Sequence, residues 1–341
     1  MTAERGTRAR NGDRLLDPSL APEPLAAELE GSIVRLAGRI GERHIWLLDR
    51  LREAEEWLAE TLAGYGYSPR REEFLARGIP VANLIAERRG NSRPDEIIVV
   101  GAHYDSRCGM RRRHGRVPDD GSPGTPGAND NASGIAATLA LARVFARRRS
   151  ERTIRFVAFV NEEPPFFRTP EMGSLVHALG CRERGERIVG MFTPETLGYY
   201  TDLPGTQRLA PVFGRDASAP GDFVAFLGSW GSRRLIDRML AGFRAATDFP
   251  VVGLPVPRLA PRVAWSDDWS FWEAGYPGVT VTDTAYLRYR HYHTPEDTPE
   301  KLEYPRMARV VAGLAAMLDD LAEGESIPAA GASESLPRRG G

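Results

Sequence analysis

Two near-continuous apolar runs, residues 96–102 and 153–160, do most to constrain the fold of this 341-residue chain. Between them, residues 132–148 carry apolar side chains at helical spacing. A strand that is apolar on both faces must be covered on both sides, which is typical of parallel sheets joined by crossover helices. The sequence therefore predicts an α/β fold with a mostly parallel central sheet and helices on both faces.

The same alternation of strands and helices continues along the chain. Residues 68–89 form shorter strand-like pieces, which predict an antiparallel hairpin at a sheet edge. Further strands are predicted at residues 188–192, 223–227 and 278–282, and further helices at residues 23–37, 44–64, 171–180, 231–245, 267–274 and 305–322.

The composition shows no break along the chain, so we expect one catalytic domain over residues 21–324. Residues 1–20 and 325–341 are polar, rich in small residues and without periodicity, which predicts disordered tails. Residues 106–127 are rich in Gly, Pro and Arg, so we expect a loop that is mobile or covers the site.

The charge and cysteine content exclude several classes of protein. Lys+Arg total 45 and Asp+Glu total 46, with no basic face, so we expect no nucleic-acid partner. No apolar run approaches the roughly 18 residues of a membrane span, and the start has no signal-peptide-like segment. Cys108 and Cys181 cannot form a disulfide framework. We therefore expect a cytoplasmic protein without a membrane partner, and the oligomeric state stays open.

Side chains that bind metals stand where the predicted strands end. His103 and Asp105 follow the first strand. Glu162 and Glu163 follow the second, and Glu195 follows the third. In open α/β sheets, ligands bind at the carboxyl ends of the strands. An aspartate near a histidine can accept the proton of the imidazole nitrogen that faces away from a metal, so Asp105 is expected to orient His103.

Two further candidates lie elsewhere in the chain. Asp130, in GANDNASG, is surrounded by small residues and suits a carboxylate that bridges two divalent cations. The alternative is that Asp130 or Asn131 only caps the following helix. His293, in HYHTPEDT, is a candidate ligand, and His291 is the alternative imidazole.

The Glu162-Glu163 doublet can divide two tasks, because adjacent residues leaving a strand point in different directions. We assign Glu163 as a metal ligand and Glu162 as general base and acid. The alternative for the doublet is a pair of solvated acids, and for Glu195 a surface acid at a strand end.

Five motifs between about residues 80 and 320 carry a family resemblance. They are GAHYDS, GTPGANDNASG, a buried strand ending in NEE, MGS, and YHTPEDTPEKL. In this order they resemble the co-catalytic dinuclear zinc aminopeptidases, the bacterial leucyl aminopeptidase-like family with glutamate carboxypeptidase and glutaminyl cyclase relatives. Two positions depart from the family pattern. Many members have aspartate at position 195, and a relative often has histidine where Asp268 stands.

The resemblance implies two Zn²⁺ ions per chain. His103 and Glu195 would hold one ion, and Glu163 and His293 the other. Asp130 would bridge the two ions, Asp105 would lie behind His103, and Glu162 would be the catalytic carboxylate.

On this resemblance we expect a zinc-dependent metallo-exopeptidase acting on a peptide or small amide substrate. An aminopeptidase is favoured, cleaving the N-terminal peptide bond through a metal-activated water with Glu162 as general base and acid. A carboxypeptidase or amide hydrolase is an alternative, since Arg258, Arg262, Arg288 and Arg290 could receive a substrate carboxylate. A glutaminyl cyclase-like acyltransferase and a non-catalytic binding protein of the same fold also stay open.

Overall fold

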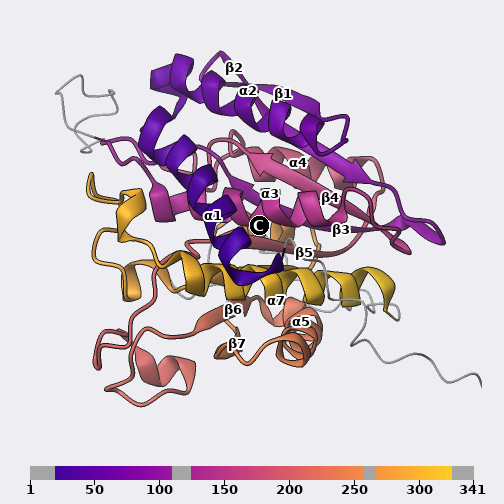
Figure 1. The fold of residues 1–341 in the computed structure, drawn as a ribbon. Helices are drawn as coiled ribbons and strands as arrows, with labels where there is room; N and C mark the ends of the chain where they lie inside the picture. The colour runs from indigo at the N-terminus through magenta and orange to yellow at the C-terminus, as the bar shows by residue number, and fades with distance from the viewer. Residues whose placement is uncertain (1–19, 110–123, 257–265, 325–341) are drawn as a thin grey trace, which may run out of the picture.

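The computed structural model describes residues 20–109, 124–256 and 266–324, and its centre is an eight-stranded sheet (Figure 1). The predicted tails and most of the predicted 106–127 loop lie outside these ranges. The strands are β1 (Arg70–Ala76), β2 (Ile79–Arg88), β3 (Arg93–His103), β4 (Arg152–Phe159), β5 (Arg187–Glu195), β6 (Val224–Gly228), β7 (Val251–Pro255) and β8 (Gly278–Thr282).

The sheet is mixed, with a parallel centre. Its strand order is β1-β2-β4-β3-β5-β8-β6-β7. The neighbours β4, β3, β5 and β8 run parallel, while β1–β2, β2–β4 and β6–β8 are antiparallel pairs. The predicted α/β fold is confirmed, and so is the antiparallel hairpin at one edge. Strand β7, at the other edge, was not predicted, because a short segment with Gly and Pro carries little strand signal.

The helices match the predicted segments closely. They are α1 (Pro22–Ile33), α2 (Leu48–Gly64), α3 (Gly134–Phe145), α4 (Gly173–Glu183), α5 (Arg233–Ala246), α6 (Asp267–Glu273) and α7 (Tyr304–Glu323). In Figure 1 the yellow helix α7 runs across the sheet beside α5. Among the described residues, none of the helices combines the length and apolarity that a membrane span requires.

Strand β3 shows why the sheet is covered on both faces. Ile98, Val100 and Ala102 pack in the core that contains α1, α2, α3, α5 and α7. Ile97 and Val99 point the other way and pack with α4 and α6. Burying one such aliphatic side chain is worth about 1.5–3 kcal/mol relative to leaving it exposed. The two-sided apolar pattern read from the sequence therefore corresponds to helices on both faces.

The parallel centre brings three strand ends to one edge of the sheet. β3 ends at His103, which pairs with Phe159 at the end of β4, and the neighbouring β5 ends at Glu195. The segments that follow these strands therefore lie close together, as the rule for ligand sites in α/β sheets requires.

Candidate metal centre

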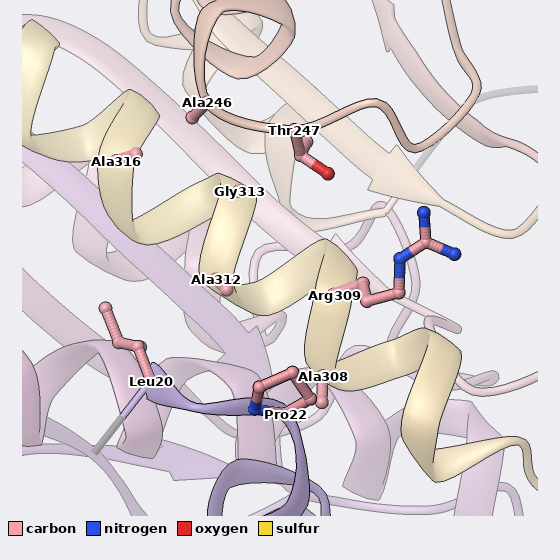
Figure 2. A pocket seen from close by; sticks show the side chains of 9 residues that line it. All are labelled: Leu20, Pro22, Ala246, Thr247, Ala308, Arg309, Ala312, Gly313 and Ala316. Atoms are coloured by element: carbon pink, nitrogen blue, oxygen red, sulfur yellow. The ribbon is translucent and has the colours of Figure 1, made fainter. Parts of the chain in front are cut away.

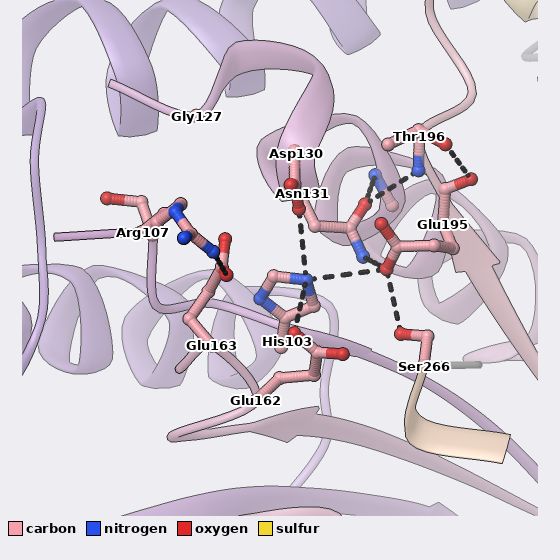
Figure 3. A network of polar contacts seen from close by, with 12 residues as sticks. His103, Arg107, Gly127, Asp130, Asn131, Glu162, Glu163, Glu195, Thr196 and Ser266 are labelled. Carbon is pink, nitrogen blue, oxygen red and sulfur yellow. Dashed lines mark hydrogen bonds and ion pairs between the residues drawn. The ribbon is translucent and has the colours of Figure 1, made fainter. Parts of the chain in front are cut away.

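Three buried side chains from separate segments converge at this edge (Figure 3). His103 comes from β3, Glu195 from β5, and Asp130 from the helical turn η5 (Ala128–Ser133). The Nε2 atom of His103 lies 3.3 Å from Asp130 Oδ1 and 3.3 Å from Glu195 Oε2. One potential ligand atom from each residue lies within 4.8 Å of the other two, so this group could hold a metal ion.

A second group shares Asp130. The Nε2 atom of His293 lies 2.8 Å from Asp130 Oδ2 and 3.5 Å from Glu163 Oε1. Asp130 thus offers one carboxylate oxygen to each group, which is the arrangement of a bridging ligand. His291 lies outside both groups, and its Nε2 accepts a hydrogen bond from Arg290 Nε at 3.2 Å.

Unpaired polar atoms point to a cation in this place. Among the described residues, three buried atoms of the two groups have no partner in hydrogen-bonding geometry: His103 Nε2, Asp130 Oδ2 and Glu163 Oε1. Leaving such an atom unsatisfied costs about 1–3 kcal/mol. Metal coordination would satisfy all three, and a set of imidazole and carboxylate donors suits a metal such as Zn²⁺.

The two glutamates after β4 separate in the way that the sequence indicated. Glu163 joins the second group, whereas Glu162 belongs to neither. The Oε2 atom of Glu162 lies 3.7 Å from His103 Nε2, and the residue is only 8 % exposed. Glu162 is therefore a buried carboxylate that lies beside the ligand groups and belongs to neither of them.

Asp105 lies beside the Nδ1 atom of His103, and its backbone oxygen is nearer to that atom than its carboxylate is. His103 Nδ1 is 3.2 Å from the backbone oxygen of Asp105 and 3.5 Å from its carboxylate Oδ1. The two carboxylate oxygens also accept the backbone N–H groups of Glu162 and Glu163, each at 3.2 Å. Asp105 therefore fixes both the imidazole and the turn that carries the glutamate doublet.

Comparison with known proteins identifies the family. Residues 83–200 match Peptidase family M28. The chain is also 32% identical over 302 residues to the uncharacterized protein YfbL of Escherichia coli K12, across 88% of this chain and 90% of that protein. The chain belongs to peptidase family M28. A probable zinc metalloprotease of Pyricularia oryzae is 28% identical over 292 residues, covering 75% of this M28 chain but only 55% of the fungal protein.

Solved structures show the same fold at low sequence identity. BSAP, a zinc aminopeptidase from Bacillus subtilis, matches with a TM-score of 0.61 and 16% identity over 89% of this chain and 97% of that chain. The glutaminyl cyclase of Porphyromonas gingivalis matches with a TM-score of 0.64 and 16% identity over 87% of this chain and 98% of that chain. The shared fold therefore occurs in peptidases and in cyclases alike.

In this M28 chain, two side chains donate hydrogen bonds to Glu195. The sequence did not predict this role for either of them. Asn131 Nδ2 and Ser266 Oγ both donate hydrogen bonds to Glu195 Oε2, at 2.8 and 2.9 Å. Asn131 Oδ1 also accepts the backbone N–H of Gly134 at 2.9 Å. The capping alternative thus describes Asn131, while the neighbouring Asp130 faces the site. Asn131 stood within a quoted motif, but nothing in the sequence marked Ser266 as a partner of Glu195.

Two other residues near the site have specific partners. Arg107 Nη1 lies 3.8 Å from Glu163 Oε2 and places a positive charge beside the second group. Asp268, at the position where a relative often has histidine, accepts the backbone N–H of Ser266 at 3.0 Å. Asp268 therefore fixes the start of α6 next to Ser266.

The surroundings of the site shift the pKa values of its acids in opposite directions. Burial raises the pKa of Glu162 well above its usual range, with His103 opposing the shift and Glu163 adding to it. Burial likewise raises the pKa of Glu163 to about 7, against the effect of His293. Burial also acts to raise the pKa of Asp130, but the neighbouring imidazoles of His103 and His293 outweigh burial and lower that pKa. Asp130 is therefore the most persistent anion of the three.

A pocket elsewhere on the molecule has no such chemistry. It has a volume of about 190 Å³ and lies between the start of α1, helix α7 and the segment after α5 (Figure 2). Its lining is mostly small and apolar, with Arg309 and Thr247 as polar members. None of the candidate site residues lines it.

Proposed function

We propose that this chain is a dinuclear zinc exopeptidase, with an aminopeptidase as the favoured type and a peptide or small amide as substrate. The observation that carries the proposal is the position of Asp130, whose two oxygens each face a separate ligand group. Membership of a peptidase family supports hydrolysis. The name of the fungal relative, a probable zinc metalloprotease, supports zinc.

The two ions would share Asp130 and otherwise have different ligands. The first would be held by His103, Asp130 and Glu195, and the second by Asp130, Glu163 and His293. When bound, zinc would polarise the scissile carbonyl and lower the pKa of water toward neutrality.

Glu162 would be the general base and acid of the reaction. A general base works best when its pKa lies near the operating pH, and burial moves the pKa of Glu162 upward from the usual carboxylate range. Glu162 would take a proton from the attacking water and return it to the departing amine nitrogen. Asp105 would hold the backbone of Glu162 and Glu163 in place through its two hydrogen bonds.

A glutaminyl cyclase-like acyltransferase is the second candidate, since a cyclase shares the fold. Two ligand groups around one shared carboxylate favour the two-ion hydrolase. A carboxypeptidase needs a free cation for the substrate carboxylate. Arg288 does not supply one, because it is buried and donates to Gln207 Oε1 and to the carbonyls of Gly221 and Phe223. Arg290 is exposed, and its Nε donates to His291 Nε2 at 3.2 Å. Arg258 and Arg262 lie outside the described residues.

The test combines elemental analysis with hydrolysis of a panel of aminoacyl-nitroanilides, for the wild type and for Glu162→Gln. We expect about two zinc ions per chain in both proteins and a loss of activity of about 10²–10⁴-fold in the variant. Exposed Glu183→Gln is the control and should behave as wild type.

Three further results would redirect the proposal. One zinc ion without nitroaniline release would favour a cyclase-like enzyme. The absence of bound metal would leave a binding protein on a peptidase fold. Parallel assays of N-terminally acetylated and C-terminally amidated peptides would separate the two exopeptidase types, because an aminopeptidase tolerates only the second modification.

A further inference from the structure

We infer that Arg43 is a positioning residue for the proposed metal centre, because it ties together the backbone segments that carry His103 and Asp130. The inference rests on the proposed function. Arg43 is fully buried and lies in the segment between α1 and α2. Its guanidinium stays protonated and offers no lone pair, so it cannot itself be a metal ligand. Its role would be to act through the segments that it holds.

The side chain of Arg43 donates to backbone carbonyls. Nε donates to Tyr104 O at 2.6 Å, and Nη1 donates to Pro126 O at 2.6 Å and to Gly41 O at 3.0 Å. Nη2 donates to Gly127 O at 3.2 Å. A planar guanidinium with five N–H donors can span several acceptors in this way, whereas a lysine ammonium cannot reproduce the fork.

These acceptors are next to the candidate ligands in the chain. Tyr104 directly follows His103, and Gly127 lies shortly before Asp130. Within the described part of the chain, residues 104–109 and 124–127 belong to no helix or strand, so regular secondary structure does not fix the position of one segment against the other. Because the Arg43 side chain binds both segments, it fixes their relative position before a metal binds. The conformational entropy of bringing the two segments together is then not lost on metal binding.

Backbone contacts of Arg43 reinforce the same junction. Its N–H donates to Ser106 Oγ at 3.1 Å, and its carbonyl accepts the N–H of Ser106 at 2.8 Å. Ser106 Oγ in turn donates to Thr125 O at 2.9 Å. The segments 104–106 and 125–127 are thus joined both through the guanidinium of Arg43 and through Ser106.

Asp297 holds the other side of the Asp130 segment. Its carboxylate accepts the backbone N–H of Asn129 at 2.8 Å and that of Asp130 at 3.1 Å, and also the hydroxyl of Tyr289 at 2.9 Å. A buried guanidinium therefore binds the carbonyls of Pro126 and Gly127, and a buried carboxyl group binds the amides of Asn129 and Asp130. Burial lowers the pKa of Arg43 to about 10, which leaves it charged at neutral pH.

The test compares Arg43→Lys with a matched control, Arg152→Lys. Arg152 is also fully buried and donates to Glu96 Oε2 at 2.5 Å and to two backbone carbonyls, but it lies at the start of β4, away from the site. Zinc affinity is measured by competition with a chelating dye. Hydrogen exchange of residues 104–106 and 125–131 is measured on the metal-free proteins.

We expect both variants to lose stability, but only Arg43→Lys to weaken zinc binding, by about 10–100-fold. We also expect faster exchange at the two segments in Arg43→Lys alone. Zinc affinity and exchange equal to wild type in a folded Arg43→Lys protein would overturn the inference. Equal weakening by Arg152→Lys would overturn it as well, since the effect would then be one of general stability.

A milder variant covers the case in which Arg43→Lys does not fold. Ser106→Ala removes the hydroxyl that joins Arg43 to Thr125 and leaves the buried charge intact. It should weaken zinc binding several-fold, and an unchanged affinity would contradict the inference. If the wild type binds no zinc, the proposed function is refuted. Hydrogen exchange of residues 104–106 and 125–131 then tests whether Arg43 positions the two segments.

Discussion

The site depends on where the two carboxylate oxygens of Asp130 point. Its Oδ1 faces His103 and its Oδ2 faces His293, although these histidines are far apart in the sequence. Its neighbour Asn131 turns the other way and donates to Glu195. One residue can therefore serve as the shared ligand while the next one orients a carboxylate.

The contact between Ser266 and Glu195 gives a prediction at this scale. Ser266→Ala removes one of the two hydrogen bonds described for Glu195 Oε2, and a hydrogen bond to a charged group is worth about 1.5–3 kcal/mol. Zinc affinity should fall by about 10–100-fold, as for other partners of metal ligands, with the fold intact. A zinc titration of the metal-free variant checks this.

Ser270→Ala is the control for this variant. Ser270 is also buried in α6, but its hydroxyl pairs with Ser174 Oγ at 2.8 Å and not with Glu195. If both substitutions weaken zinc binding equally, the effect comes from α6 as a whole and not from the bond to Glu195.

At the scale of elements, the parallel centre of the sheet creates the site. The register of β3 with β4 and β5 places three carboxyl ends at one edge, and η5 inserts Asp130 between them. The close approach of α3 to the end of β5 depends on Gly134. A Cβ atom on Gly134 would lie 2.1 Å from Pro194 O and 2.3 Å from Asn131 Oδ1.

Gly134→Ala should therefore move α3 away from the end of β5 and destabilise the protein by about 1–3 kcal/mol, the usual cost of overpacking. It should also disturb Glu195, which follows Pro194. Gly31→Ala in α1 is the matched control. A Cβ there meets no described atom within 4 Å, so alanine should stabilise its helix by about 0.5–1 kcal/mol. Chemical denaturation of the metal-free proteins measures both values, and a neutral Gly134→Ala would contradict the tight contact.

At the scale of the whole molecule, folding concentrates acidic side chains from distant segments in one buried place. Asp130, Glu162, Glu163 and Glu195 all lie close to His103 or His293, and burial raises the pKa of the three glutamates. Buried like charges oppose folding unless protons or cations compensate them. Metal binding and global stability should therefore be linked.

Zinc should raise the thermal midpoint of the metal-free protein, and a chelator should reverse the change. Binding to the folded state alone contributes about 4 kcal/mol when free zinc is 1,000 times Kd. Glu163→Gln should lose most of this gain, because it removes a candidate ligand of the second group. Glu87→Gln, whose carboxylate pairs with Arg155 at 2.7 Å, should keep it. Differential scanning calorimetry gives the shift, and an equal zinc response in all three proteins would rule out the proposed sites.

The sequence by itself determined the α/β alternation, the edge hairpin and the strand ends at which His103, the glutamate doublet and Glu195 stand. These features could be predicted because apolar periodicity and strand-end position are local properties of the chain. The same reading named Asp130 and His293 from their motifs, but it left His291 and the capping alternative open.

Only the tertiary structure decided which atoms meet. It placed His293 and not His291 beside Asp130, divided the roles of Asp130 and Asn131, and brought Ser266 to Glu195. It also revealed Arg43, whose partners are backbone carbonyls that no sequence motif encodes. The physical reason is that such contacts join residues far apart in the chain. Their geometry is set by strand register, side-chain direction and packing, none of which a local pattern contains.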